Sequence, residues 1–144
     1  MRAVVTRVSS ASVEIDGVIN GEIGKGLLVL LGIKTTDTKA GAEKLAQKIC
    51  NLRIFADEAG KMNLDINDAG GDMLIISQFT LYADLKSRRP GFTEAARPDV
   101  AIPLYEYFIS ECKKGGFEVE TGEFGAMMDV KSVNDGPVTI IIEV

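Results

Sequence analysis

The sequence of 144 residues contains no histidine. This absence excludes serine-histidine-aspartate and cysteine-histidine machinery, a histidine general base, and the usual histidine-containing zinc sites of hydrolases. An enzyme built from this chain must therefore use backbone N–H groups, hydroxyls, carboxylates or the substrate itself. No metal site or cofactor motif is visible in the sequence, so we expect neither a metal nor a cofactor.

Cysteine is scarce, and the two cysteines, Cys50 and Cys112, lie far apart in the sequence. They indicate neither a disulfide framework nor a C-x-x-C redox pair. Since unpaired cysteine is often interior, we interpret both as small buried apolar residues.

Long hydrophobic runs are also absent. The longest, from Leu27 to Ile33, is far shorter than the ~20 residues that a membrane-spanning helix needs. The first residues lack the apolar core and cleavage site of a signal peptide. With 46% hydrophobic and 26% charged residues, the composition is that of a globular protein. We therefore expect one domain over residues 1–144, located in the cytoplasm, with no membrane partner.

Acidic residues outnumber basic ones, and the net charge is -5. This balance argues against a protein that coats nucleic acid non-specifically, so no DNA partner is expected. The segment from Lys86 to Arg97 differs, because it holds four basic residues and one acidic residue. It is either a solvated loop or a patch that contacts phosphates.

Hydrophobic periodicity predicts an α+β domain of mixed α/β type. Its core is a curled, largely antiparallel or mixed, barrel-like sheet with two main helices. The expected strands and hairpins are 3–15, 22–33, 54–66, 72–82 and 117–144, with turns at 16–17 and 20–21. The expected helices are 38–52 and 98–114, the second with a buried face of Ile102, Tyr105, Phe108, Ile109 and Cys112.

Two stretches stand out, Ser77-Gln78-Phe79-Thr80-Leu81-Tyr82 at the end of an expected strand and Asn134-Asp135-Gly136-Pro137-Val138-Thr139 before the last one. From pattern alone, the first could hold polar residues on the exposed face of a half-buried strand. The second could be an ordinary turn with proline at the start of a strand.

Taken together, the two stretches resemble the D-aminoacyl-tRNA deacylase family, whose hallmarks are an SQFTLY and an NxGPVT segment. The resemblance extends along the chain to residues 7–13, 89–92, 95–96 and 124–128. It implies a homodimeric hydrolase that cleaves the ester between a D-amino acid and tRNA and rejects L-aminoacyl-tRNA. Since glycine has no Cβ that could collide with a chirality-selecting segment, we also expect glycyl-tRNA as a substrate.

The resemblance also implies roles for individual residues. Gly136-Pro137 would adopt the cis form and enter the site of the other subunit, braced by Arg7. The catalytic segment would comprise Ser77, Gln78, Phe79 and Thr80, with backbone amides near Gln78 and Phe79 facing the oxyanion.

Two further assignments concern Thr80 and the basic segment. Thr80 could be a nucleophile, or it could orient the substrate while the ribose hydroxyl assists attack by water. We favour orientation, because no general base is in evidence. Lys86, Arg88 and Arg89 would contact tRNA.

Two other functions fit parts of the sequence. An RNA-binding domain could stack bases on Phe79, Tyr82 and Phe92, although the acidic net charge and the Gly-Pro segment disfavour it. A hydrolase of small D-amino acid esters or amides stays open.

Overall fold

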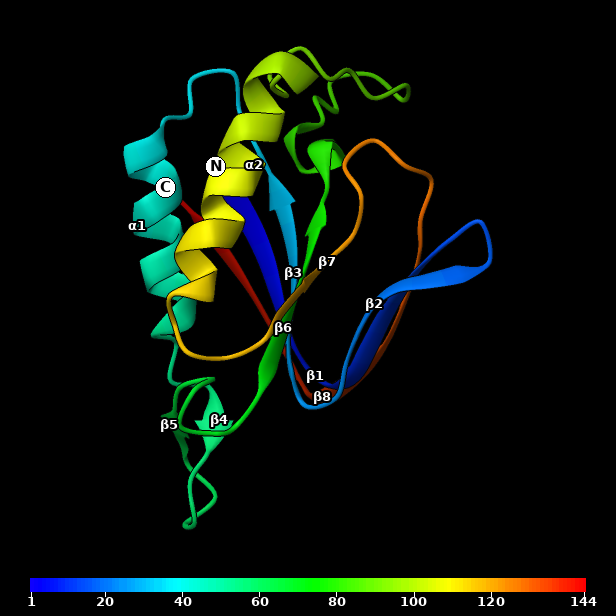
Figure 1. Ribbon diagram of the computed structural model, residues 1–144. Coiled ribbons are helices and arrows are strands. Elements are labelled where there is room, and N and C mark those ends of the chain that lie inside the picture. Colours follow the sequence, from blue (N-terminus) through cyan, green and yellow to red (C-terminus); the bar gives the residue numbers. More distant parts are fainter.

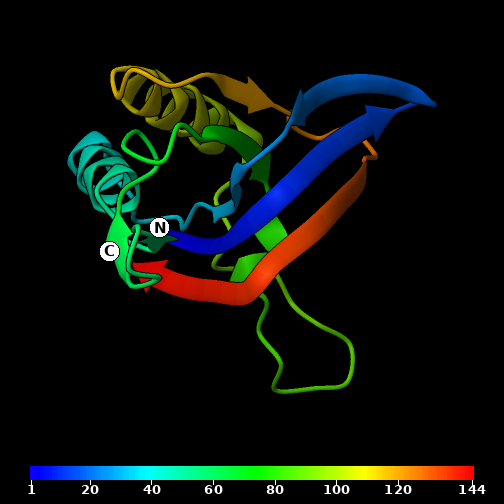
Figure 2. The same cartoon turned by 90° about the horizontal axis from the view of Figure 1, so that it is seen from below.

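A curled six-stranded sheet with two helices on one face makes up the computed structural model, which describes residues 1–144 (Figures 1 and 2). The strands run in the order β2-β1-β3-β6-β7, and β8 pairs with the other edge of β1. A separate two-stranded hairpin joins β4 and β5. The bounds are β1 Arg2–Ile15, β2 Val18–Ile23, β3 Gly26–Gly32, α1 Lys39–Cys50, β4 Phe55–Ala56, β5 Met62–Leu64, β6 Asp72–Ser77, the 3-10 helix η1 Phe79–Tyr82, α2 Pro98–Lys113, β7 Val119–Thr121 and β8 Asp129–Glu143.

Strand β1 organises the sheet because it pairs along both edges. Its first half is antiparallel to β3, its second half is antiparallel to β2, and β8 runs antiparallel along its whole length (Figure 2). Apolar residues alternate along β1 and point to the two buried faces of the curl. The buried ones are Ala3, Val5, Val8, Ala11 and Val13.

The centre of the sheet is parallel. Strand β3 pairs in parallel with β6, and β6 with β7. Both β3 and β6 are nearly continuous apolar runs, as is typical of strands covered on both faces. The sheet is therefore mixed.

The sheet curls until its two outer strands meet. The Asn20 side-chain Nδ2 on β2 donates a hydrogen bond of 2.8 Å to the carbonyl oxygen of Thr121 on β7. The space inside this curl holds a core of seven buried residues, Val8, Ala11, Val13, Ile23, Leu28, Leu74 and Ile76. This closure confirms the predicted barrel-like core.

The two helices cover the other face and enclose the larger core (Figure 1). Helix α1 begins where the Thr38 Oγ1 accepts a hydrogen bond of 3.2 Å from the Gly41 N–H. Helix α2 begins at Pro98, whose missing N–H costs nothing in the first turn. Neither helix is long and apolar enough to cross a membrane.

The predicted buried face of α2 was partly wrong. Tyr105, Phe108 and Cys112 are buried as expected, but Ala101 and Leu104 replace Ile102 and Ile109, which are only half-buried. The helix is rotated so that its small Ala101 faces the core, which periodicity alone does not decide.

Four details of the strands and turns also differ from the prediction. The expected strand 22–33 is two strands that break at residues 24 and 25, and Asn20-Gly21 lies inside β2 and not in a turn. The expected strand 72–82 ends at Ser77 and passes into η1. Residues 134–137 lie within β8, so they are a deformation of a strand and not a turn before one.

Candidate active site

A cleft of about 430 Å³ opens where β3, β6, η1 and the start of α2 converge. The loop that precedes β8 closes its far side. Apolar side chains supply 11 of the 15 lining residues. The polar ones are Ser77, Gln78 and Thr80, so a few polar groups converge on an apolar hollow, as in small-molecule sites.

The end of β6 delivers these residues to the cleft. Ser77 is the last residue of the parallel ladder and pairs with Leu31. The Gln78 N–H then donates a hydrogen bond of 2.8 Å to the Leu31 carbonyl, after which the chain turns into η1. The N–H groups of Phe79 and Thr80 lie in the first turn of η1, where a helix leaves its backbone donors without an intrahelical acceptor. These two amides are the donors that the wall of the cleft can offer to a ligand.

Thr80 is held by its neighbour on the same wall. The Gln78 Nε2 donates a hydrogen bond of 2.5 Å to the Thr80 Oγ1. No carboxylate, lysine or arginine lines the cleft. The Thr80 hydroxyl therefore accepts a hydrogen bond from Gln78, and no charged side chain of the cleft lining is available to take its proton.

A cluster joining the two ends of the chain supports η1 from behind. The Arg2 Nη1 donates a hydrogen bond of 2.7 Å to the Leu81 carbonyl, and the same guanidinium pairs with Glu143 at 3.0 Å. Burial of Tyr82 raises the pKa of its hydroxyl, which donates to Glu143 at 3.4 Å. The hydrogen bond from Arg2 lowers the pKa of Glu143. Sequence pattern gave no sign of this cluster, since nothing local links residues 2 and 143.

The Gly136-Pro137 peptide is cis and exposed on β8. It lies between the β8 partners of Val8 and Thr6, which are Asn134 and Thr139, where the β1–β8 register shifts. Arg7 holds the segment from beneath, since its Nη1 donates to the Ile54 carbonyl at 2.5 Å and its Nε pairs with the Asp135 carboxylate at 3.2 Å.

Within one chain, these residues are not part of the cleft. Arg7, Gly136 and Pro137 are all absent from its lining. Arg7 and Asp135 instead border another hollow of about 400 Å³ with Lys25 and Phe55. The structure thus brings together the four residues of the SQFT segment and keeps the Gly-Pro segment apart from them.

The basic residues lie on an exposed loop beside the cleft. Paired backbone hydrogen bonds of 2.7 and 2.9 Å between Asp84 and Gly91 close this loop, which carries Lys86, Arg88 and Arg89. At its base, the Phe92 ring meets the Phe79 ring edge-on at 5.0 Å. Since Phe79 lines the cleft, the basic loop rises from the rim.

The opposite wall was not assigned a role from the sequence. Residues 124–128 form it, with the Met127 side chain 92% exposed and the Phe124 ring 5.9 Å from the Tyr105 ring. The only sequence signal was the match of this segment to the family pattern. An exposed methionine at the mouth of an apolar hollow is available to contact a ligand.

The model of the D-Tyr-tRNA(Tyr) deacylase family matches residues 4–143, nearly the whole chain. The chain belongs to this family. It is 56% identical to the D-aminoacyl-tRNA deacylase of Thermosipho africanus, over 99% of this chain and 97% of that one. It is also 56% identical to the D-aminoacyl-tRNA deacylase of Bacillus thuringiensis, over 99% of both chains. These findings confirm the predicted family and the predicted class, a hydrolase of the aminoacyl-tRNA ester bond.

Solved structures agree on the fold of this deacylase-family chain. A protein described as the c-Myc DNA unwinding element binding protein is 41% identical, with a TM-score of 0.94 over 100% of this chain and 99% of that one. A probable eukaryotic D-amino acid tRNA deacylase is 16% identical, with a TM-score of 0.87 over 99% of this chain and 98% of that one. The second likeness concerns the fold alone.

Proposed function

We propose that the protein hydrolyses the ester that joins D-amino acids or glycine to tRNA, and that it rejects L-aminoacyl-tRNA with the Gly136-Pro137 segment of a second subunit. One observation carries this proposal. The cleft presents the amides of Phe79 and Thr80, while the Arg7-braced segment is exposed outside that cleft. A second copy of the chain can complete the site.

The free edge of β8 supports a homodimer. Strand β8 is 15 residues long and pairs only with β1, so its other edge has unpaired backbone groups. Long unpaired edges invite pairing with another chain. Val130, Val133 and Ile141 add exposed apolar surface to the same strand. A two-fold pair of these strands would carry each Gly-Pro segment toward the neighbouring subunit.

The chemistry needs little from side chains. Hydrolysis of an ester passes through a tetrahedral oxyanion, which two backbone N–H groups can stabilise. The amides of Phe79 and Thr80 are the candidates, because the Gln78 amide is already bonded to Leu31. The attacking water would be assisted by the free ribose hydroxyl of the terminal adenosine, so a cleft without carboxylate or histidine suffices.

Selection of the D form is an exclusion problem, because L-aminoacyl-tRNA must survive. Main-chain groups of Gly136 and Pro137 would accept the α-amino group of a D-residue and collide with the Cβ of an L-residue. Because these main-chain groups would not contact the side chain of the D-residue, we expect the protein to accept many different D-amino acids. Glycine has no Cβ, so glycyl-tRNA passes the same gate.

The decisive experiment compares four substrates with the purified protein: D-tyrosyl-tRNA, L-tyrosyl-tRNA, glycyl-tRNA and a small D-tyrosyl ester. We expect hydrolysis of the first and third, at least about 100-fold slower loss of the second, and little turnover of the last. If glycyl-tRNA stays intact at enzyme concentrations that hydrolyse D-tyrosyl-tRNA, the proposed steric exclusion by Gly136 and Pro137 is wrong. Equal turnover of the small ester would favour a hydrolase that does not need tRNA.

Thr80→Ala separates orientation from nucleophilic attack. The variant loses one hydrogen bond to Gln78, so kcat should fall by no more than about tenfold. Loss of an obligatory nucleophile would cost about 10⁴-fold or more. Single-turnover deacylation of D-tyrosyl-tRNA measures the difference, with Thr93→Ala, an exposed threonine outside the cleft lining, as the control. A loss near the larger figure would make Thr80 the nucleophile.

Arg88→Ala tests whether the basic loop contacts the acceptor strand. Removing one phosphate contact should weaken tRNA binding and reduce the salt slope of log K by about one. The control is Lys44→Ala, an exposed lysine on α1. Binding of non-hydrolysed aminoacyl-tRNA across a salt series gives both slopes. If the two variants have the same salt slope of log K, the loop is a solvated surface that does not contact tRNA phosphates.

A further inference from the structure

The 3-10 helix η1, which carries the amides of Phe79 and Thr80, is only one turn long. It spans four residues, Phe79–Tyr82, and a single turn has too few internal hydrogen bonds to be stable alone. Contacts with other elements must therefore fix its place in the cleft wall. Since a displacement of about 1 Å in a catalytic group can cost about 100-fold in rate, these contacts bear directly on the reaction.

Strand β3 packs closely against η1. The Gln78 N–H donates a hydrogen bond of 2.8 Å to the Leu31 carbonyl. A Cβ at the next residue, Gly32, would lie 2.9 Å from the Leu81 Cβ and 3.1 Å from the Gln78 carbonyl oxygen, so only glycine fits there. This packing stops η1 from moving toward β3 but does not stop it from moving away.

Arg2 ties the end of η1 to the sheet. Its Nη1 donates a hydrogen bond of 2.7 Å to the Leu81 carbonyl, and its guanidinium carbon lies 4.9 Å from the centre of the Tyr82 ring. The Nε and Nη2 of the same group donate to the carboxylate of Glu143 at 3.2 and 3.0 Å. Glu143 is the β8 residue that pairs with Arg2 in the β1–β8 ladder. The planar guanidinium therefore links η1 to β8 by charge-assisted hydrogen bonds.

We propose that Arg2 is a positioning residue for deacylation, which acts through the Leu81 carbonyl and is oriented by Glu143. By holding η1, it keeps the amides of Phe79 and Thr80 in place at the cleft. Neither Arg2 nor Glu143 lines the cleft, so both act through the backbone of η1 and not on the substrate. The inference rests on the proposed role of the two amides as donors to the oxyanion.

Three variants separate the contacts of Arg2. Arg2→Ala removes the hydrogen bond to the Leu81 carbonyl and the ion pair together. Arg2→Lys keeps a positive charge but lacks the planar fork that reaches both partners. Glu143→Gln removes the charge that orients Arg2 and leaves the bond to Leu81 in place. We expect the largest effects for the first variant and intermediate effects for the other two.

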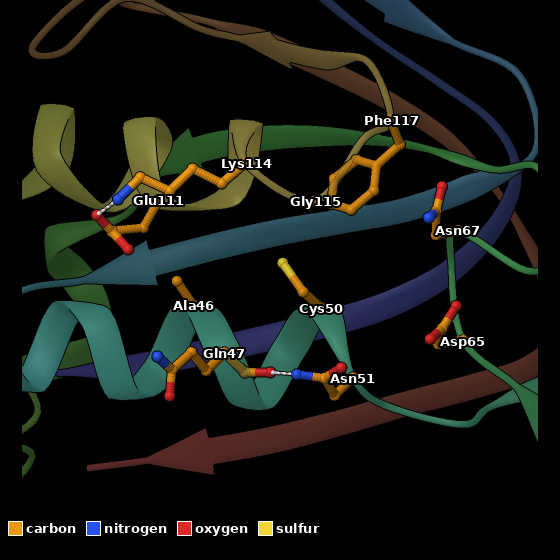
Figure 3. A pocket seen from close by; sticks show the side chains of 10 residues that line it. All are labelled: Ala46, Gln47, Cys50, Asn51, Asp65, Asn67, Glu111, Lys114, Gly115 and Phe117. Carbon is orange, nitrogen blue, oxygen red and sulfur yellow. Dashed lines mark hydrogen bonds and ion pairs between the residues drawn. The ribbon is translucent and has the colours of Figure 1, made fainter.

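The matched control removes an ion pair elsewhere on the surface. Lys114 pairs with Glu111 at 2.7 Å, at the C-terminal end of α2, and Figure 3 shows this pair beside a separate hollow between the ends of α1 and α2. Neither residue lines the cleft. Lys114→Ala should therefore leave both η1 and turnover as they are in the parent.

Two measurements on the full-length protein test the proposal. Hydrogen–deuterium exchange of peptides covering residues 78–83 reports how firmly η1 is held, without any need for turnover. Single-turnover and steady-state deacylation of D-tyrosyl-tRNA give kcat and KM. For Arg2→Ala we expect exchange at least about tenfold faster in this segment, with kcat lower by about 10- to 100-fold and KM unchanged.

Each contrary outcome has a separate meaning. Parent-like exchange of residues 78–83 in Arg2→Ala would show that Arg2 does not hold η1, and faster exchange with a parent-like kcat would remove its role in the reaction. An equal fall in kcat for Lys114→Ala would attribute the loss to general destabilisation and overturn the proposal as well. A parent protein that leaves D-tyrosyl-tRNA intact would overturn the proposed function alone, because the exchange measurement does not depend on turnover.

Discussion

Gly136→Ala is expected to lower kcat/KM for D-tyrosyl-tRNA by about 100-fold or more while the fold persists. Gly136 has φ +118°, a conformation that side chains rarely adopt. A Cβ there would lie 2.7 Å from the Arg7 Nη2 and 3.1 Å from the Val138 Cγ2. Either Arg7 loses its contact with Asp135 or the Gly136-Pro137 segment moves. In both cases the segment no longer blocks L-aminoacyl groups as proposed.

The measurement pairs deacylation of D- and L-tyrosyl-tRNA with a thermal melt. Gly24→Ala is the matched control, because a Cβ at Gly24 meets no atom within 4 Å and its φ is not positive. Because the strained φ at position 136 costs about 1–3 kcal/mol, the melting temperature of Gly136→Ala should fall by several degrees without loss of the fold. A variant with parent-like rate and parent-like rejection of the L form would remove this segment from the mechanism.

Gly26→Ala is expected to destabilise the protein by about 3 kcal/mol or more, or to prevent folding. Gly26 begins β3 opposite Asp72 of β6 in the parallel ladder. A Cβ at Gly26 would lie 1.8 Å from the Asp72 carbonyl oxygen and 2.7 Å from its carbonyl carbon. These are backbone atoms of a paired central strand, so they cannot move aside without breaking the β3–β6 ladder.

Urea unfolding followed by circular dichroism measures this loss. The same Gly24→Ala variant, two residues earlier in the connection to β3, should stay within about 1 kcal/mol of the parent. The contrast isolates the close approach of two strands from the general effect of replacing a glycine. Equal midpoints for the two variants would contradict the predicted clash.

Sequence pattern correctly predicted the helix, turn and hairpin whose residues lie close together in the sequence. The three- and four-residue spacing of Ala42, Leu45, Ala46 and Ile49 predicted α1, and these four residues are buried. The Asp16-Gly17 turn and the β4–β5 hairpin were also predicted correctly. Each of these features depends on residues that are close in sequence.

Predictions from sequence pattern were wrong where contacts between distant segments determine which residues are buried or which secondary structure forms. Ile102 is more hydrophobic than Ala101, yet Ala101 is buried and Ile102 is only half-buried, because the packing of α2 against distant elements sets the rotation of the helix. Asn20-Gly21 has turn composition, but Asn20 bonds across the closing sheet to Thr121. Thr80 was placed on a strand, whereas support of η1 by Arg2 and Glu143, from the two chain ends, favours a 3-10 turn there.

By itself, the sequence determined the family, the fold class and the residues of the two motifs, because these are carried by residue type and spacing. Only the tertiary structure decided that the Gln78 amide bonds to Leu31 beside the cleft, that the Gly-Pro segment lies outside the cleft, and that Arg2 pairs with Glu143 and bonds to the Leu81 carbonyl. The physical reason is that each of these outcomes is a contact, or the lack of one, between segments dozens of residues apart. Such contacts are set by how the sheet curls and how the helices pack on it, and no window of sequence contains both partners.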